Sequence, residues 1–405
     1  MKVPNKTLEF IISSFLTLFA MSVSKVSGLV INMLCIKYLG QSEFGQLSYL
    51  RSTAALFEGI SAGGNNALTI TESKDKRKTI SIILSYLIYF SFFSLLIFLL
   101  FFFKVDGVSL FSFNEIAMIV IIFLFSLGVG MINSMLIGNR SNKLLLNLSV
   151  LSSLISLVVA SVLIIFFGYI GAVLSIFFYF FIDFSLKFNS IYSGLLSSVG
   201  KVSLSFFFRS LRYSFISLTS LFLFWFVRTK VVSQSGGLEV LAAFELSYQF
   251  VTVVMIIIGS LISNFLARMS SNLKSMLYMA VAIILIAITL SVIAFFSIEI
   301  IVPYINGAYL NVIDEIKWTV FISIPFSLQV VFSRITLHFK EDWINLVSGT
   351  FSSFICLAYL LNTSIYDIRF IVTLYSMYYC LFVGIILLLS AFKKVKYASK
   401  WFEIF

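Results

Sequence analysis

The sequence has few charged residues and very few prolines. Asp, Glu, Lys and Arg make up 11% of the 405 residues, whereas hydrophobic residues make up 60%. Soluble domains contain about 25% charged residues, so this chain cannot cover itself with a polar surface, and a soluble enzyme is excluded. Only three prolines are present, which favours long uninterrupted helices. The composition therefore predicts an all-α integral membrane protein.

Metal-binding and catalytic side chains are also scarce. The three cysteines lie in or beside hydrophobic runs, and the single histidine is His338. Without a spaced Cys/His set, we expect neither a zinc site nor a disulfide framework. Without a Walker-type phosphate loop, we expect no direct use of ATP. We therefore predict no catalytic residues, no metal and no cofactor.

Basic residues outnumber acidic residues by 28 to 17. Such an excess in a soluble protein would suggest nucleic acid as a partner. Here the basic residues fall mostly in the short gaps between hydrophobic runs, where they orient a membrane protein. We therefore expect no nucleic acid partner.

Hydrophobic runs of about 20 residues are long enough to cross a membrane as helices, and the sequence contains about twelve of them. The even number and the concentration of Lys and Arg in alternate gaps predict that both termini are cytoplasmic. No predicted loop is long enough to form a catalytic domain. The predicted spans are 9–35, 46–70, 80–103, 114–138, 144–167, 170–192, 209–229, 240–265, 276–298, 316–335, 343–362 and 368–391.

A short motif occurs once in each half of the chain. The sequence QLSY at 46–49 and the sequence ELSY at 245–248 lie early in a predicted span and are 199 residues apart. Four residues can match by chance, but the spacing agrees with two bundles of six spans, 1–200 and 201–405. Because six is even, both bundles would enter the membrane in the same direction.

Three segments resemble a known family. The sequence KYLGQSEFGQLSY at 37–49 resembles the connection after the first span in bacterial polysaccharide flippases, which include the O-antigen-unit flippases. The turn GYIGAV at 168–173 and the loop IVPYINGAY at 301–309 are similar to segments of the same family. This family belongs to the multidrug/oligosaccharidyl-lipid/polysaccharide exporter superfamily, and the resemblance in span number and layout covers essentially the whole chain.

The resemblance implies a fold and a function. The fold would be MATE-like, with two six-helix bundles around a central cavity. The protein would be a multi-pass flippase of the bacterial inner membrane that moves an undecaprenyl-pyrophosphate-linked oligosaccharide, an O-antigen or capsule repeat unit, by alternating access. Membrane lipid, a polysaccharide polymerase and a chain-length regulator would be its partners.

Two alternatives to the flippase function remain open. One is a multidrug exporter of the same superfamily, although basic groups inside the spans disfavour cationic drugs. The other is a membrane polysaccharide polymerase, an enzyme that would need a large periplasmic loop. The sequence lacks such a loop, so we expect a transporter and not an enzyme.

Ionisable groups within the predicted spans indicate where a substrate would bind, because such groups usually face protein or water. Lys25 and Asn32 share one face of the first span, and Arg51, Glu58 and Asn65 recur every seven residues in the second. Lys and Arg can pair with phosphate, and Asn can bind sugar hydroxyl groups. We predict that Lys25, Asn32, Arg51 and Asn65 bind the substrate. Alternatively, Arg51 and Glu58 form a buried structural pair.

Two carboxyl groups are predicted to couple transport to an ion gradient. Glu58 lies in the second span and Glu245 early in the eighth, and either could take up a proton there. Neutralisation of Arg51 is the alternative role of Glu58. Arg212 is predicted to bind phosphate at the cytoplasmic mouth, although anchoring at the membrane surface would also explain it.

Three other charged residues have simpler explanations. Asp183 and Lys187 are four residues apart on one helix, which predicts a local ion pair. Arg228 lies at the predicted outer end of the seventh span, where we expect an outer-loop charge, although it could instead receive the substrate headgroup on that side.

Overall fold

The computed structural model describes residues 6–73, 75, 78–105, 108–196, 204–266, 273–338, 342–363 and 366–392. The chain is helical in these ranges and forms no strand there. Helices satisfy every backbone hydrogen bond within the segment, which a lipid environment demands. The predicted all-α fold is confirmed.

The first half of the chain contains five helices, the last of which folds back on itself. They are α1 (Lys6–Tyr38), α2 (Gln41–Glu72), α3 (Thr79–Phe102), α4 (Phe113–Gly138) and α5 (Asn142–Leu196), with a short 3-10 turn η2 (Val108–Leu110) before α4. Gly168 in α5 has φ 54° and ψ −129°, a conformation that glycine adopts without strain. Ser152 before this glycine hydrogen-bonds Asp183 after it at 2.6 Å, so the chain reverses at Gly168. As predicted, α5 comprises two antiparallel spans.

The second half contains the remaining helices. They are α6 (Ser205–Val232), α7 (Gly237–Leu266), α8 (Leu273–Ile305), α9 (Ile313–Thr319), α10 (Ser323–His338), α11 (Asp342–Leu361) and α12 (Ile368–Phe392). The 3-10 turns η3 (Gly307–Val312) and η4 (Val320–Ile322) flank α9. The tenth predicted span is therefore built from η3, α9, η4 and α10 in succession.

The number of membrane-length segments agrees with the sequence prediction. In the described part of the chain, nine segments are long and apolar enough to cross a membrane. One of them, Asn142–Ser190, contains both arms of α5, and α2 and α6 are not among the nine although they are 32 and 28 residues long. Counting both arms of α5 and adding α2 and α6 gives the predicted twelve. α2, which carries Arg51, Glu58 and Asn65, is more polar than these nine segments.

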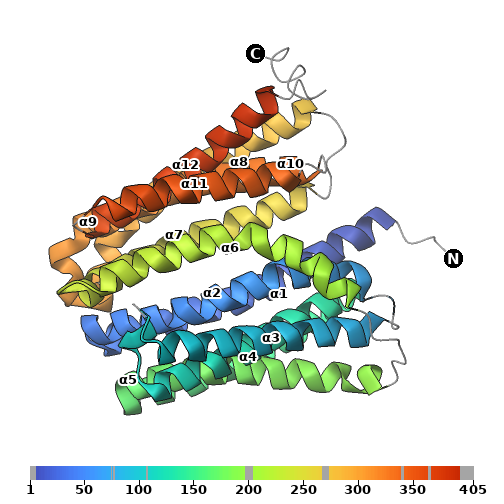
Figure 1. The fold of residues 1–405 in the computed structure, drawn as a ribbon, viewed down its shortest axis with the longest axis horizontal. Coiled ribbons are helices and arrows are strands. Elements are labelled where there is room, and N and C mark those ends of the chain that lie inside the picture. Colours follow the sequence, from blue (N-terminus) through green and yellow to red (C-terminus); the bar gives the residue numbers. More distant parts are fainter. Residues whose placement is uncertain are drawn as a thin grey trace. The chain divides into compact units, whose positions relative to one another are not determined.

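The chain forms two compact units, Met1–Leu221 and Phe222–Phe405. Within each unit the long helices run nearly parallel or antiparallel to one another (Figure 1). In the first unit α1 packs on α5, and α4 packs on both α2 and α5. In the second unit α10 packs on α8 and α12, and α11 packs on α12. The chain passes from one unit to the other within α6, and the predicted division after residue 200 stays a prediction.

Candidate functional site

Arg51 in α2 reaches across to α1. Its Nη1 atom donates a hydrogen bond to Oδ1 of Asn32, which is 6% exposed. Asparagine is neutral, so this contact fixes the guanidinium without cancelling its charge. Among the described residues Arg51 forms no ion pair with a carboxylate. A guanidinium carries five N–H donors, so most of them remain for another acceptor.

The face of α2 that carries Arg51 is less buried than the opposite face. Ala55 lies one turn after Arg51 and is exposed, and Glu58 is partly exposed. By contrast, Phe57 and Ile60 are buried, with 3% and 5% of their surfaces exposed. Positions i, i+4 and i+7 share one side of a helix, so Arg51, Ala55 and Glu58 form a single accessible strip.

The three polar residues of α2 contact three different helices. Arg51 contacts α1, whereas the carboxyl group of Glu58 forms a hydrogen bond with Ser126 of α4. Asn65 is fully buried and accepts a 2.9 Å hydrogen bond from Ser85 of α3. The alternative Arg51–Glu58 pair does not form in the described part of the chain. The predicted roles of Glu58 in coupling and of Asn65 in binding stay predictions.

Lys25 is exposed on α1 and has no carboxylate partner among the described residues. It lies two turns before Asn32, and Glu58 lies two turns after Arg51. Because α1 and α2 run in opposite directions, Lys25 and Glu58 lie on the same side of the Asn32–Arg51 contact, about 10 Å along the helices. Lys25 and Arg51 are therefore two cations of the first helix pair that have no carboxylate partner among the described residues, and the carboxyl group of Glu58 lies in the same stretch of the pair.

The start of α6 is attached to the end of α2. Nη2 of Arg209 lies 2.5 Å from Oε1 of Glu72, and Nζ of Lys78 lies 3.3 Å from the second oxygen of the same carboxylate. Arg212 lies one turn later in α6, but its side chain falls outside the part of the chain that the structure describes. Its predicted role in phosphate binding stays a prediction.

Glu245 in α7 forms a buried ion pair with Arg228 in α6. Oε1 of Glu245 lies 2.7 Å from Nη2 and 2.9 Å from Nε of Arg228, and both side chains are 13% exposed. The third nitrogen, Nη1, donates to the Tyr375 hydroxyl at 2.7 Å. The rings of Phe244 and Tyr375 lie 5.8 and 5.9 Å from the guanidinium carbon. Arg228 is therefore a buried helical residue and not the outer-loop charge that we expected.

The sequence contains a signal for this pair that our sequence analysis missed. Arg228 and Glu245 are equally distant from the turn at Gly236 and Gly237, and two antiparallel helices bring such mirror positions together. Asn32 and Arg51 likewise lie on opposite sides of the α1–α2 turn, with the arginine here on the second helix of the pair. The first helix pair of each half is thus joined through an arginine, which contacts an amide in the first unit and a carboxylate in the second.

Comparisons with known proteins identify the fold. No protein-family model matches the sequence, and a search of curated proteins finds no match. Among solved structures, an inward-facing multidrug resistance MATE family transporter of the MOP superfamily matches with a TM-score of 0.69 and 13% identity over 94% of this chain and 99% of its own. The outward-facing conformation of such a transporter matches with a TM-score of 0.55 and 14% identity over 93% of both chains.

A third solved structure also matches over nearly its full length. It is a MOP superfamily transporter from Pyrococcus furiosus, described as having a binding pocket of reverse polarity, and it matches with a TM-score of 0.60 and 13% identity over 95% of this chain and 96% of its own. This chain has the MATE fold. The predicted two-bundle MATE-like architecture is therefore confirmed, and the identities are low enough that the likeness concerns the fold alone.

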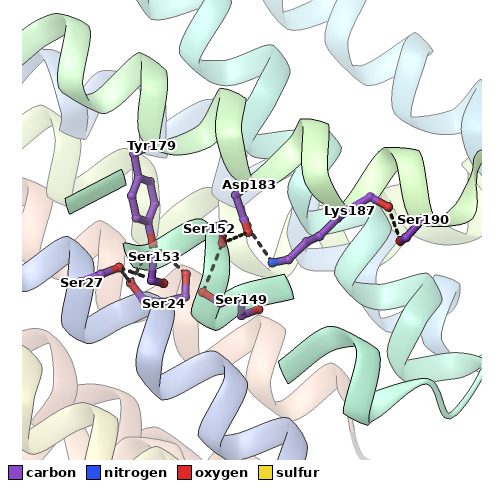
Figure 2. A network of polar contacts seen from close by, with 9 residues as sticks. All are labelled: Ser24, Ser27, Ser149, Ser152, Ser153, Tyr179, Asp183, Lys187 and Ser190. Carbon is purple, nitrogen blue, oxygen red and sulfur yellow. Dashed lines mark hydrogen bonds and ion pairs between the residues drawn. The ribbon is translucent and has the colours of Figure 1, made fainter. Parts of the chain in front are cut away.

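A polar network joins α1 to both arms of α5 in this MATE-fold chain. Nζ of Lys187 lies 2.7 Å from Asp183, four residues earlier, which confirms the predicted local ion pair. The Ser152 hydroxyl donates to Asp183, and the Tyr179 hydroxyl donates to the backbone oxygen of Ser24 at 2.7 Å. Figure 2 shows these contacts together with Ser27, Ser149, Ser153 and Ser190. The pair is neutral overall and buried, and Asp183 also accepts from Ser152, so it fits a structural role better than binding.

No group of three or more His, Cys, Asp or Glu side chains that could hold a metal ion occurs in the described ranges. The candidate functional site of this MATE-fold chain is therefore the first helix pair, with Lys25, Arg51 and Glu58 on its accessible side.

Proposed function

We propose that the protein is a flippase that moves an undecaprenyl-pyrophosphate-linked oligosaccharide between the leaflets of the bacterial inner membrane by alternating access. Three lines of support converge on this proposal. The fold is that of MATE transporters, which are known in inward- and outward-facing conformations. Three sequence segments resemble polysaccharide flippases. The accessible strip of α2 presents an uncompensated arginine.

The uncompensated charge of Arg51 is the observation on which the proposal rests. In the described part of the chain, the buried cations Lys187 and Lys317 pair with carboxylates, Lys187 with Asp183 and Lys317 with Glu299. Inserting a charged side chain into a bilayer costs about 2.5–3.5 kcal/mol, so an unpaired Arg51 requires water or an anion beside it. A pyrophosphate group supplies the anion, and a guanidinium binds phosphate oxygens in a bidentate manner.

Transport needs no covalent chemistry in this proposal. Lys25 and Arg51 bind the pyrophosphate while the polyprenyl tail stays in lipid, and Arg212 receives the headgroup at the cytoplasmic mouth. Glu58, two turns after Arg51 on α2, is the first candidate for coupling to an ion gradient. Glu245 is the second candidate, because its protonation would break the ion pair with Arg228.

The cellular setting follows from the same proposal. Both termini lie in the cytoplasm, and the flipped repeat unit is delivered to a polysaccharide polymerase and a chain-length regulator.

A multidrug exporter is the second candidate function, because the inward- and outward-facing neighbours are described as multidrug resistance transporters. Two cations without carboxylate partners would repel a cationic drug. The reverse polarity of the binding pocket in the Pyrococcus furiosus neighbour is described as suggesting a different function, and the two unpaired cations favour an anionic cargo here.

The test replaces Lys25 and Arg51 separately by alanine in a strain that lacks the chromosomal gene. We expect each variant to reduce surface polysaccharide by about tenfold or more, because one charge-assisted contact is lost, and lipid-linked units to accumulate on the cytoplasmic side. Lys143→Ala, which removes an exposed cation from α5, is the matched control and should leave the polymer unchanged.

Three results would reject the proposal. Full polymer in both variants at matched protein levels would show that the cations are not needed. Accumulation of lipid-linked units on the periplasmic side would indicate a polymerase. Increased drug sensitivity of the deletion strain with normal polysaccharide would indicate a multidrug exporter.

A further inference from the structure

The two arginines that join the first helix pair of each half differ in how completely they are engaged. Arg228 uses Nε, Nη1 and Nη2 for contacts with Glu245 and Tyr375. Arg51 uses Nη1 for its contact with Asn32. The first helix pair of the second unit is therefore joined by a neutralised arginine on its first helix, and that of the first unit by a charged arginine on its second helix.

We propose that Asn32 is a positioning residue that determines the preference of this transporter for anionic cargo. Its neutral amide oxygen fixes the Arg51 guanidinium on the accessible strip of α2 and leaves the positive charge uncompensated. A carboxylate at this position would hold the arginine equally well and would cancel the charge. This inference rests on the proposed function, because it concerns the same cation.

The burial of Asn32 favours positioning over direct binding. Asn32 is 6% exposed, whereas Arg51 and Lys25 are accessible to a larger extent. A cargo molecule therefore reaches the two cations more easily than the amide. We replace our sequence prediction that Asn32 binds the substrate with this indirect role.

The second unit shows what a carboxylate does in this setting. Glu245 lies against two nitrogens of Arg228, and the pair is closed in by the rings of Phe244 and Tyr375. A carboxylate occupies the side of a guanidinium that a bidentate phosphate would need. Aspartate at position 32 would likewise pair with the arginine and cancel its charge.

The experiment compares the effects of two substitutions on anion binding. If Asn32 had a purely structural role, the order of these two effects would be the opposite of the order that we expect. Asn32→Asp keeps and strengthens the contact with Arg51, whereas Asn32→Ala removes it. The probe is geranyl pyrophosphate, a short polyprenyl pyrophosphate, and its binding to the purified full-length protein in detergent is measured by calorimetry. Thermal unfolding of each variant is recorded in the same detergent. Asn114→Asp, which adds the same charge at an exposed position of α4, is the matched control.

We expect Asn32→Asp to weaken binding of geranyl pyrophosphate by at least tenfold, and by more than Asn32→Ala does, while its unfolding temperature stays at or above that of the unchanged protein. Binding by Asn114→Asp should be unchanged. A tenfold loss corresponds to about 1.4 kcal/mol.

Two outcomes would overturn the inference and are distinguishable from each other. In the first outcome, Asn32→Asp binds geranyl pyrophosphate as well as Asn32→Ala does, or unfolds at a lower temperature than Asn32→Ala, and Arg51→Ala binds weakly. Asn32 then does not act by preserving the charge of Arg51, and the proposed function stands. If Arg51→Ala binds geranyl pyrophosphate as tightly as the unchanged protein, the proposed anion site fails together with the inference.

Discussion

Replacing Glu245 by alanine should destabilise the second unit, because it leaves the Arg228 guanidinium buried without a counter-charge. Both side chains are 13% exposed, and two nitrogens of Arg228 lie within 3 Å of one carboxylate oxygen. Removing one partner of a buried ion pair costs about 3–5 kcal/mol. A unit of this size loses about 2–4 °C in unfolding temperature per kcal/mol. We take 3 kcal/mol as the lower bound and expect a fall of about 6 °C or more.

The assay heats the purified protein in detergent and measures, at each temperature, the fraction of the protein that remains monodisperse. Glu239→Ala removes an exposed carboxylate from the first turn of the same helix, and as a control it should change stability by less than about 0.5 kcal/mol. The double variant Arg228→Met with Glu245→Leu removes both charges and should recover most of the loss. If Glu245→Ala unfolds at the same temperature as Glu239→Ala, the pair does not stabilise the unit.

Two further predictions concern α5. Gly171→Ala should destabilise the first unit by about 3 kcal/mol, because its Cβ would lie 1.8 Å from the backbone oxygen of Leu163. The control Gly384→Ala, whose Cβ meets nothing within 4 Å, should be neutral in the same unfolding assay. Equal stabilities of the two variants would contradict the tight turn. Asp183→Ala should cost about 3 kcal/mol, because Lys187 is 1% exposed, and adding Lys187→Met should restore stability; a stable single variant would refute the structural role of this pair.

Much of the fold follows from local properties of the sequence. Long apolar runs without proline have few alternatives to helices in lipid, so the helical segments lie close to the predicted ranges. The glycine-rich turn after 167 is local as well, because only glycine adopts the backbone angles of Gly168 without strain. The Asp183–Lys187 pair follows from a spacing of four on one helix.

The candidate site was less predictable because it depends on contacts between helices. The seven-residue spacing of Arg51, Glu58 and Asn65 correctly places them on neighbouring parts of α2. However, the spacing drifts by about 20° per step, and long side chains turn toward whichever helix is adjacent. The Arg228–Glu245 pair was missed for a related reason, since a charge near a predicted span end resembles a loop charge unless the opposite helix is considered.

In the proposed function, the strip of α2 with Arg51 faces water and accepts an anion. The most direct measurement labels Ala55→Cys, one turn from Arg51, with a membrane-impermeant maleimide in a background without the three native cysteines. Leu95→Cys, which is 60% exposed on α3, reports a lipid-facing position. We predict rapid labelling at position 55, protection by geranyl pyrophosphate, loss of that protection in Arg51→Ala, and no labelling at position 95. A position 55 that labels as slowly as position 95 would contradict the central claim.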